Sequence, residues 1–147
     1  MKAASTIILS SLAATAFAAT QPWQVRDLKE VDSTSAQGIS QVGFTFENPN
    51  SGVTTNCTYA NAPGSGRPPT VQSYTPCKNQ NVRFTYERTS DKTANIAVEY
   101  VTTNAAGNVQ GVQNSMGVVD LVSSSEGTTT DYTSEESELF PGAETGA

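Results

Sequence analysis

Residues 42–86 read VGFTFENPNSGVTTNCTYANAPGSGRPPTVQSYTPCKNQNVRFTY and contain both cysteines of the chain, Cys57 and Cys77. At the two ends of this stretch, 42–46 and 82–86, apolar and polar residues alternate, as they do in half-buried β-strands. The middle is rich in proline and glycine, which favours turns and excludes a central strand. The stretch therefore predicts strands on either side of a long loop bracketed by two cysteines.

The first half of the stretch predicts a β-hairpin. Residues 42–46 carry an apolar side chain at every second position, and 53–59 alternates again. Between them, 48–52 reads Asn-Pro-Asn-Ser-Gly, a dense turn signal whose glycine tolerates positive φ. Two alternating segments joined by such a turn are typical of a hairpin.

A second hairpin is predicted with a defined register. The register that sets Val82 opposite Tyr100 also brings the other apolar residues of the two segments together, Phe84 with Val98 and Tyr86 with Ile96. On the opposite face it sets Arg83 against Glu99, a favourable cross-strand charge pair. Both faces thus agree on a single pairing.

Further short strands are expected around Trp23 and Val25 and over 116–122. Outside the N-terminus, no segment has the 3.6-residue apolar period of a helix. About seven short strands separated by turn signals indicate an all-β domain, an antiparallel β-sandwich or barrel. The predicted core consists of Trp23, Phe44, Phe46, Phe84, Tyr86, Ile96 and Val98.

The N-terminus predicts a secreted, extracellular protein. Residues 1–18 contain one cation, a short apolar run and a small-x-small ending at Ala18, the features of a cleaved signal peptide. The alternative for this run is a buried N-terminal helix. In an oxidising compartment two cysteines favour one disulfide, Cys57–Cys77, over two free thiols or an intermolecular bridge. The β-domain is then expected over 19–122.

The charge of the chain is concentrated at its C-terminus. Residues 20–122 contain seven Lys or Arg and eight Asp or Glu, whereas 123–147 contains six acidic residues and no basic one. This acidic, Ser/Thr-rich tail is predicted to be disordered. Its Tyr132, Leu139 and Phe140 offer an alternative, a short linear binding motif. The chain has no basic patch, so neither nucleic acid nor a membrane surface is expected as a partner.

The sequence argues against catalysis. It contains no histidine, which removes the usual general base and most zinc sites. No phosphate-binding glycine loop is present, and no cofactor or metal is expected. A small hydrolase would need two converging carboxylates, but the acidic residues of 20–122 are predicted in outward strand positions or turns. These residues are Asp27, Glu30, Asp32, Glu47, Glu87, Asp91, Glu99 and Asp120.

The loop over 61–76 is the candidate interaction site, with Asn61, Arg67 and Tyr74 as its contact residues. It holds four of the seven prolines of the chain, and the expected disulfide tethers it. Long loops held on a rigid scaffold often carry function. The alternative is a mere connection between strands.

One modification motif is present. Asn56-Cys57-Thr58 is an N-glycosylation sequon, and the strand alternation turns Asn56 away from the Cys57 side. Early closure of the disulfide is the alternative outcome, since it would block modification.

The order and spacing of these motifs resemble a family of small fungal secreted proteins, the Alternaria major-allergen family. The residues that carry the resemblance are Trp23 to Leu28, Val42 to Phe46 followed by Asn48-Pro49-Asn50, the Cys57 and Cys77 pair, Phe84 to Tyr86 and Ile96 to Val98. The resemblance implies a β-barrel or β-sandwich and a role as an effector, elicitor or allergen that binds host proteins without catalysis.

The expected function is therefore binding of an extracellular protein, of the host if the resemblance holds. A carbohydrate-binding module is the alternative, with Trp23, Tyr59 or Tyr74 as sugar platforms, and weak carbohydrate binding is compatible with either function. The exposure of Trp23 discriminates between them, because a sugar platform must be open to solvent.

Overall fold

The computed structural model describes residues 20–142 and 145–146, so the predicted signal peptide at 1–18 lies outside the described residues. All secondary structure in the described part of the chain is β-strand. None of these residues belongs to a helix long and apolar enough to cross a membrane.

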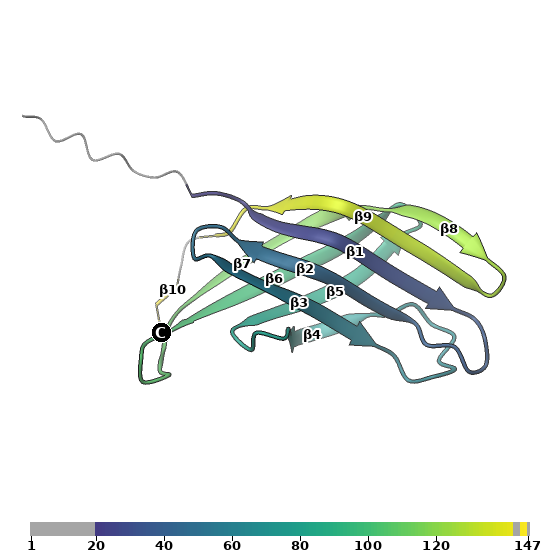
Figure 1. Ribbon diagram of the computed structural model, residues 1–147, viewed down its shortest axis with the longest axis horizontal. Coiled ribbons are helices and arrows are strands. Elements are labelled where there is room, and N and C mark those ends of the chain that lie inside the picture. Colours follow the sequence, from purple (N-terminus) through teal and green to yellow (C-terminus); the bar gives the residue numbers. More distant parts are fainter. Residues whose placement is uncertain (1–19, 143–144, 147) are drawn as a thin grey trace, which may run out of the picture.

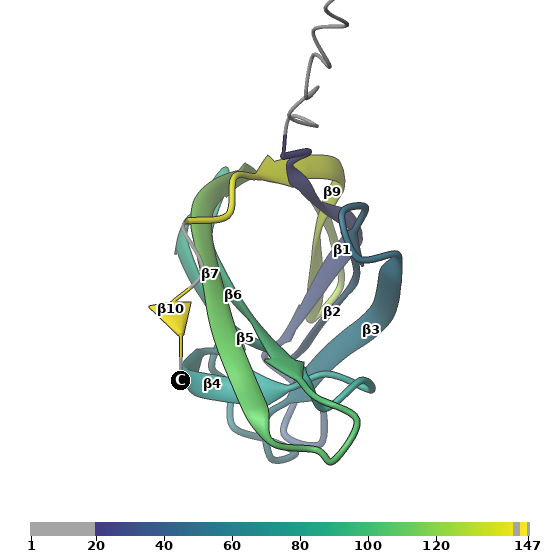
Figure 2. The ribbon, with the colours of Figure 1, turned by 90° about the vertical axis from the view of Figure 1, so that its left-hand side faces the viewer.

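Within residues 20–142 and 145–146, ten strands form two antiparallel sheets of five, which pack face to face (Figures 1 and 2). The first sheet has the order β3-β2-β1-β9-β8 and consists of β1 (Trp23–Ser33), β2 (Gln41–Asn48), β3 (Val53–Ala60), β8 (Val122–Glu126) and β9 (Thr129–Leu139). The second sheet has the order β10-β7-β6-β5-β4 and consists of β4 (Val71–Pro76), β5 (Val82–Ser90), β6 (Thr93–Thr103), β7 (Val109–Asp120) and β10 (Thr145–Gly146). The predicted all-β antiparallel sandwich is confirmed, with more strands than the expected seven.

Both predicted hairpins form. In the first, Phe44 of β2 lies opposite Cys57 of β3. In the second, β5 and β6 take the predicted register, including Phe84 opposite Val98. Arg83 lies opposite Glu99 and forms the expected ion pair at 3.5 Å.

The core lies between the two sheets and contains every residue predicted for it. Trp23 is 0% exposed and packs edge-on against Phe46 and Tyr100, at ring-centroid distances of 5.3 and 6.4 Å. Phe44 and Phe84 form a third edge-on pair, which joins the two sheets. Such aromatic pairs contribute about 0.5–1.5 kcal/mol each beyond the burial of their surface.

The prediction of a disordered acidic tail over 123–147 is wrong. Residues 122–126 and 129–139 form β8 and β9, and β9 pairs with β1 on one side and β8 on the other. Tyr132 and Leu139 are buried in the core, so only Phe140 of the alternative linear motif is exposed. The prediction of disorder was based on side-chain composition. The backbone of β9, however, forms hydrogen bonds with a strand on each side, and these hold it in the sheet although its exposed side chains are acidic.

A bulge in β1 shifts the alternation of that strand. Asp27 has a φ of 53° and lies where the pairing of β1 with β2 changes register. Trp23 and Val25 face the core before it, and Leu28 and Glu30 face the core after it. A β-bulge reverses the facing of the residues that follow. β1 continues beyond the bulge to Ser33, paired with β9 along its length.

The sandwich is closed at both sides. On one side the Cys57–Cys77 disulfide, which was predicted, joins β3 to the residue after β4. On the other side the chain leaves β9 and crosses to β7, where Ser115 donates to the carbonyl of Phe140 and Gly142 donates to that of Asn114 (Figure 2). The disulfide is typical of proteins of an oxidising, extracellular compartment.

Candidate interaction face

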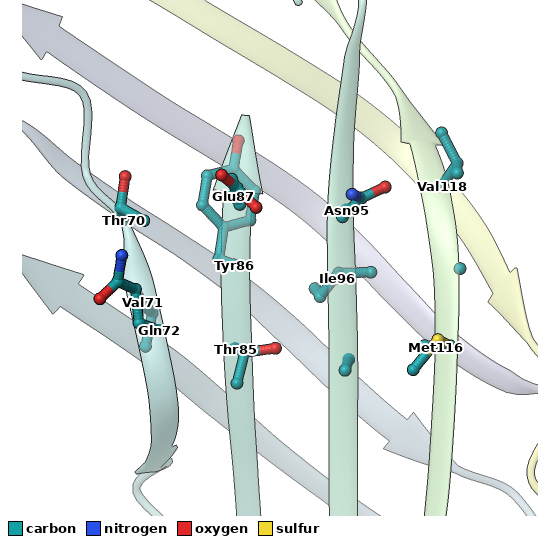
Figure 3. A pocket seen from close by; sticks show the side chains of 12 residues that line it. Thr70, Val71, Gln72, Thr85, Tyr86, Glu87, Asn95, Ile96, Met116 and Val118 are labelled. Atoms are coloured by element: carbon teal, nitrogen blue, oxygen red, sulfur yellow. The ribbon is translucent and has the colours of Figure 1, made fainter. Parts of the chain in front are cut away.

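The outer face of the second sheet has a shallow hollow of about 540 Å³ (Figure 3). Two cross-strand rows line it, Thr85–Ala97–Met116 and Glu87–Asn95–Val118. The hollow exists because Thr85 and Ala97, in its floor, have short side chains. In Figure 3 these strands lie in front, with the first sheet behind them.

One wall of the hollow is apolar and open to solvent. Met116 is 80% exposed and Val118 is 64% exposed, although both lie within the long strand β7. The residues that alternate with them, Gly117 and Val119, face the first sheet, and Gly117 lies against Leu139. Exposed apolar side chains grouped at a hollow mark an interaction site more often than singly scattered ones do.

The predicted interaction loop continues this hollow. Asn61 and Arg67 line a second hollow of about 560 Å³, which shares Thr70, Gln72 and Glu87 with the first. We call the two hollows together the interaction face. Glu87 is exposed, and neither Glu87 nor Arg67 is in an ion pair with another described residue. The face therefore presents two uncompensated charges of opposite sign beside an apolar wall.

The loop is ordered by its own hydrogen bonds. The side-chain amide of Asn61 donates to the carbonyls of Arg67 and Pro68, at 3.0 and 3.1 Å. The backbone amide of Gly64 donates to the carbonyl of Gly38 at 2.8 Å, so the loop leans on 34–40. A loop held in one conformation loses less entropy when it binds a partner.

Residues 71–76 are an edge strand, β4, where the sequence predicted the end of a loop. Proline is tolerated there because an edge strand has one unpaired side, which agrees with the exclusion of a central strand. Tyr74 of β4 is 40% exposed but lines neither hollow of the interaction face. Its partial burial and the negative charge of Glu99 raise the pKa of its phenol. The structure thus groups Asn61 with Arg67 and separates Tyr74 from them.

The three candidate sugar platforms do not form an exposed row. Trp23 is buried, Tyr59 is half-buried and Tyr74 alone is exposed. Carbohydrate stacking needs an aromatic face that is free of protein contacts.

A charged cluster that the sequence did not reveal lies between the sheets at the end of β1. Glu30, expected to point outward or lie in a turn, is fully buried, and Asp32 and Asp91 lie near it. Arg88 of β5 bonds all three, with its Nε 2.9 Å from Glu30, one Nη 2.9 Å from Asp32 and the other 3.2 Å from Asp91. Strand alternation alone places Glu30 outward because it does not include the bulge at Asp27, which turns Glu30 toward the core.

Aromatic residues complete this cluster. The Tyr86 hydroxyl donates a short hydrogen bond of 2.5 Å to Glu30, and the guanidinium of Arg88 stacks on Tyr132 at 4.2 Å from the ring centroid. Burial raises the pKa of the Glu30 carboxyl above its ordinary 4.5, against the opposing effect of bonds from Tyr86 and Arg88. Burial and the bond to Glu30 raise the pKa of the Tyr86 phenol.

This cluster ties the sheets together. Burial on its own would lower the pKa of Arg88, but the hydrogen bond and the charge of Glu30 raise it, so the guanidinium stays charged. Glu30 is out of reach of a substrate, and Asp32 already accepts bonds from Ser40 and Arg88. Among the described residues, no group of three or more acidic, cysteine or histidine side chains is placed to hold a metal ion.

The predicted glycosylation site lies on the opposite side of the molecule. Asn56 is exposed in β3, on the outer face of the first sheet, while Cys57 is buried beneath it.

No protein-family model and no curated protein matches this chain.

Proposed function

We propose that this protein is secreted and binds an extracellular protein, without catalysis, through its interaction face. The observation that carries the proposal is the exposed pair Met116 and Val118 beside a hollow that runs into an ordered loop. Apolar side chains at the centre of a contact, with polar groups at its rim, are the usual plan of a protein interface. The Alternaria-family resemblance extends the proposal to an effector-like role in which the partner belongs to a host.

The buried state of Trp23 favours a protein partner over a carbohydrate. The sheet offers apolar aliphatic groups and two unpaired charges at its hollow, which complement a side-chain surface better than a sugar ring. The disulfide supports delivery to an oxidising compartment.

The test is capture from extracellular host extract with immobilised protein, beside a panel of polysaccharides. We expect one specific protein to be retained and to be lost with the double variant Met116→Asp, Val118→Asp, and with a chain in which residues 62–68 are replaced by a glycine-serine linker. Thr54→Asp, at an exposed position of β3, is the matched control and should retain the partner.

Circular dichroism of each variant shows whether the fold is kept. Retention on a polysaccharide without any captured protein would replace the proposal by the carbohydrate-binding alternative. Equal capture by the double variant and by the control would show that the interaction face is not the binding surface.

A further inference from the structure

The triplet Asn56-Cys57-Thr58 is the only Asn-x-Ser/Thr sequence in the chain, and the fold presents it in an unusual way. It lies in β3, one of the two edge strands of the first sheet. Asn56 and Thr58 are exposed, whereas Cys57 between them points into the core. The strand alternation thus separates the amide and hydroxyl of the triplet from its disulfide.

The amide of Asn56 is oriented by its neighbour on β2. Thr45 Oγ1 donates a hydrogen bond of 3.3 Å to Asn56 Oδ1. Because the oxygen faces Thr45, the nitrogen lies on the other side of the amide group. Among the described residues, Asn56 Nδ2 has no hydrogen-bond partner. The atom that would carry a sugar is therefore free.

A hollow of about 410 Å³ lies beside this amide. Its floor is open because Gly43, which pairs with Thr58 on one side and Lys29 on the other, has no side chain. Thr45, Lys29 and Asp27 supply donors and acceptors around it. A hollow with this lining suits a polyhydroxylated ring, which needs hydrogen bonds at its edge.

The surrounding surface has the character of a solvated face. Lys29 pairs with Asp131 at 2.8 Å, and Arg26 pairs with Glu47 at 3.4 Å. No large apolar side chain is exposed on β1, β2 or β3. The interaction face lies on the other sheet. A group attached to the outer face of the first sheet would therefore leave the interaction face accessible.

We propose that Asn56 carries an N-linked oligosaccharide whose first sugar lies over the Gly43 hollow. The inference rests on the proposed secretion, because the donor is a lipid-linked oligosaccharide diphosphate of the secretory pathway. Asn56 Nδ2 forms a bond to the anomeric carbon of the first N-acetylglucosamine, and the proton that it loses passes to the departing diphosphate. The bond from that carbon to the diphosphate oxygen breaks, and the lipid diphosphate leaves with the electron pair.

The test uses the full-length chain in a eukaryotic secretory host, with its own residues 1–18 and, in parallel, with a proven signal sequence in their place. Intact mass is measured before and after treatment with an amidase that removes N-glycans. We expect one glycan, and conversion of Asn56 to aspartate in the treated peptide. Asn56→Gln and Thr58→Ala should abolish it, while Thr58→Ser should keep it.

An unmodified Asn56 in the chain secreted from the proven signal sequence would overturn the inference. If the chain is glycosylated with the proven sequence but is retained in the cell with its own, the inference is supported and the proposed secretion fails. The two proposals are thus separated by one comparison.

The position of the sugar has its own readout. Nuclear Overhauser contacts between the N-acetyl methyl group and the methyl groups of Thr45 or Thr58 are expected. Gly43→Thr fills the hollow, and an added Cβ meets Thr58 at 3.4 Å, an ordinary contact. This variant should keep the glycan and lose those contacts. A glycan without such contacts in the unaltered protein would overturn the placement over the hollow.

Discussion

Arg88 holds charged groups that would otherwise be buried without a partner. Its guanidinium joins Glu30 and Asp32 of β1 to β5 across the sandwich and stacks on Tyr132 of β9. Burying ions costs several kcal/mol each, and only good geometry with further hydrogen bonds offsets that cost. The Tyr86 hydroxyl supplies one such bond. The cluster is therefore sensitive to the loss of any single member.

Arg88→Met should lower the free energy of unfolding by about 3–5 kcal/mol, because Glu30 is then left buried with no cation. Urea unfolding followed by fluorescence gives the value. Arg83→Met is the control, since the Arg83–Glu99 pair is partly exposed and contributes at most about 1 kcal/mol. Equal losses in the two variants would contradict the role given to Arg88.

Glu30 should also affect the pH dependence of stability. The folded protein holds the proton of Glu30 more tightly than the unfolded chain does, because the pKa is raised in the fold. Its contribution is therefore complete below the ordinary pKa of 4.5 and is lost as the pH rises through the raised value. The stability of the unaltered protein relative to Glu30→Gln should fall over that window, as measured by Tm from pH 4 upward. A difference that is constant or rises would show the opposite sign of shift.

At Gly64, in the loop over 61–70, both the backbone conformation and the close approach of Ala36 favour glycine. Its φ is +72°, and a Cβ there would lie 2.5 Å from the carbonyl oxygen of Ala36. Gly64→Ala should cost about 1–2 kcal/mol for the left-handed conformation, and more for the clash. Gly66→Ala is a matched control, with a φ of +57° and no atom within 4 Å of its Cβ. Thermal unfolding of both variants measures the difference, and equal shifts in Tm would mean that the loop can move away from Ala36.

At the scale of elements, β9 shows where sequence patterns are insufficient. The hairpin of β5 and β6 could be predicted because its apolar residues alternate without interruption. In β9 the two buried apolar residues, Tyr132 and Leu139, are seven positions apart, which no simple alternation places on one face. Glu135 and Glu136, which lie beside the bulge in β1, are both exposed, so the alternation of β9 is interrupted there. This interruption lets both Tyr132 and Leu139 face the core. Residues 129–139 form a strand because they pair with β1, which is distant in the sequence, and local sequence patterns do not reveal such pairing.

The same limit applies to the site. The loop that carries Asn61 and Arg67 could be predicted because proline and glycine mark it. Met116 and Val118 could not, because an alternating strand does not say which of its faces is covered. Their exposure depends on the partner sheet, which packs on Gly117 and Val119 instead.

The disulfide links the edges of the two sheets on the β3–β4 side, together with hydrogen bonds from Lys78 and Asn79 to β3. Replacing both cysteines by alanine should lower the free energy of unfolding by about 3 kcal/mol, because the bond closes a loop of 20 residues. Amide exchange over 61–70 should accelerate as well. The unaltered protein under non-reducing conditions is the control, and an unchanged unfolding midpoint would contradict the prediction.

For the whole molecule, the two-sheet arrangement depends on the residues after β7. A chain that ends at Leu121 lacks β9, which pairs with β1 along its length, and should lose cooperative thermal unfolding. A chain that ends at Gly142 lacks β10 alone and should keep it. Differential scanning calorimetry compares the two, and a cooperative transition in the shorter chain would show that the first sheet does not require β9.

The pairing of Trp23 with Leu139 gives the molecule a mechanical property. Since β1 begins beside the end of β9, tension applied to both ends of the folded part pulls these strands apart sideways. Once the pairing of β10 with β7 and the hydrogen bonds at Phe140 and Gly142 have broken, the hydrogen bonds between β1 and β9 break one pair at a time from Trp23, so these two strands separate at low force. The Cys57–Cys77 bond shields the residues between its cysteines from that force, and the chain extends by less than its full contour.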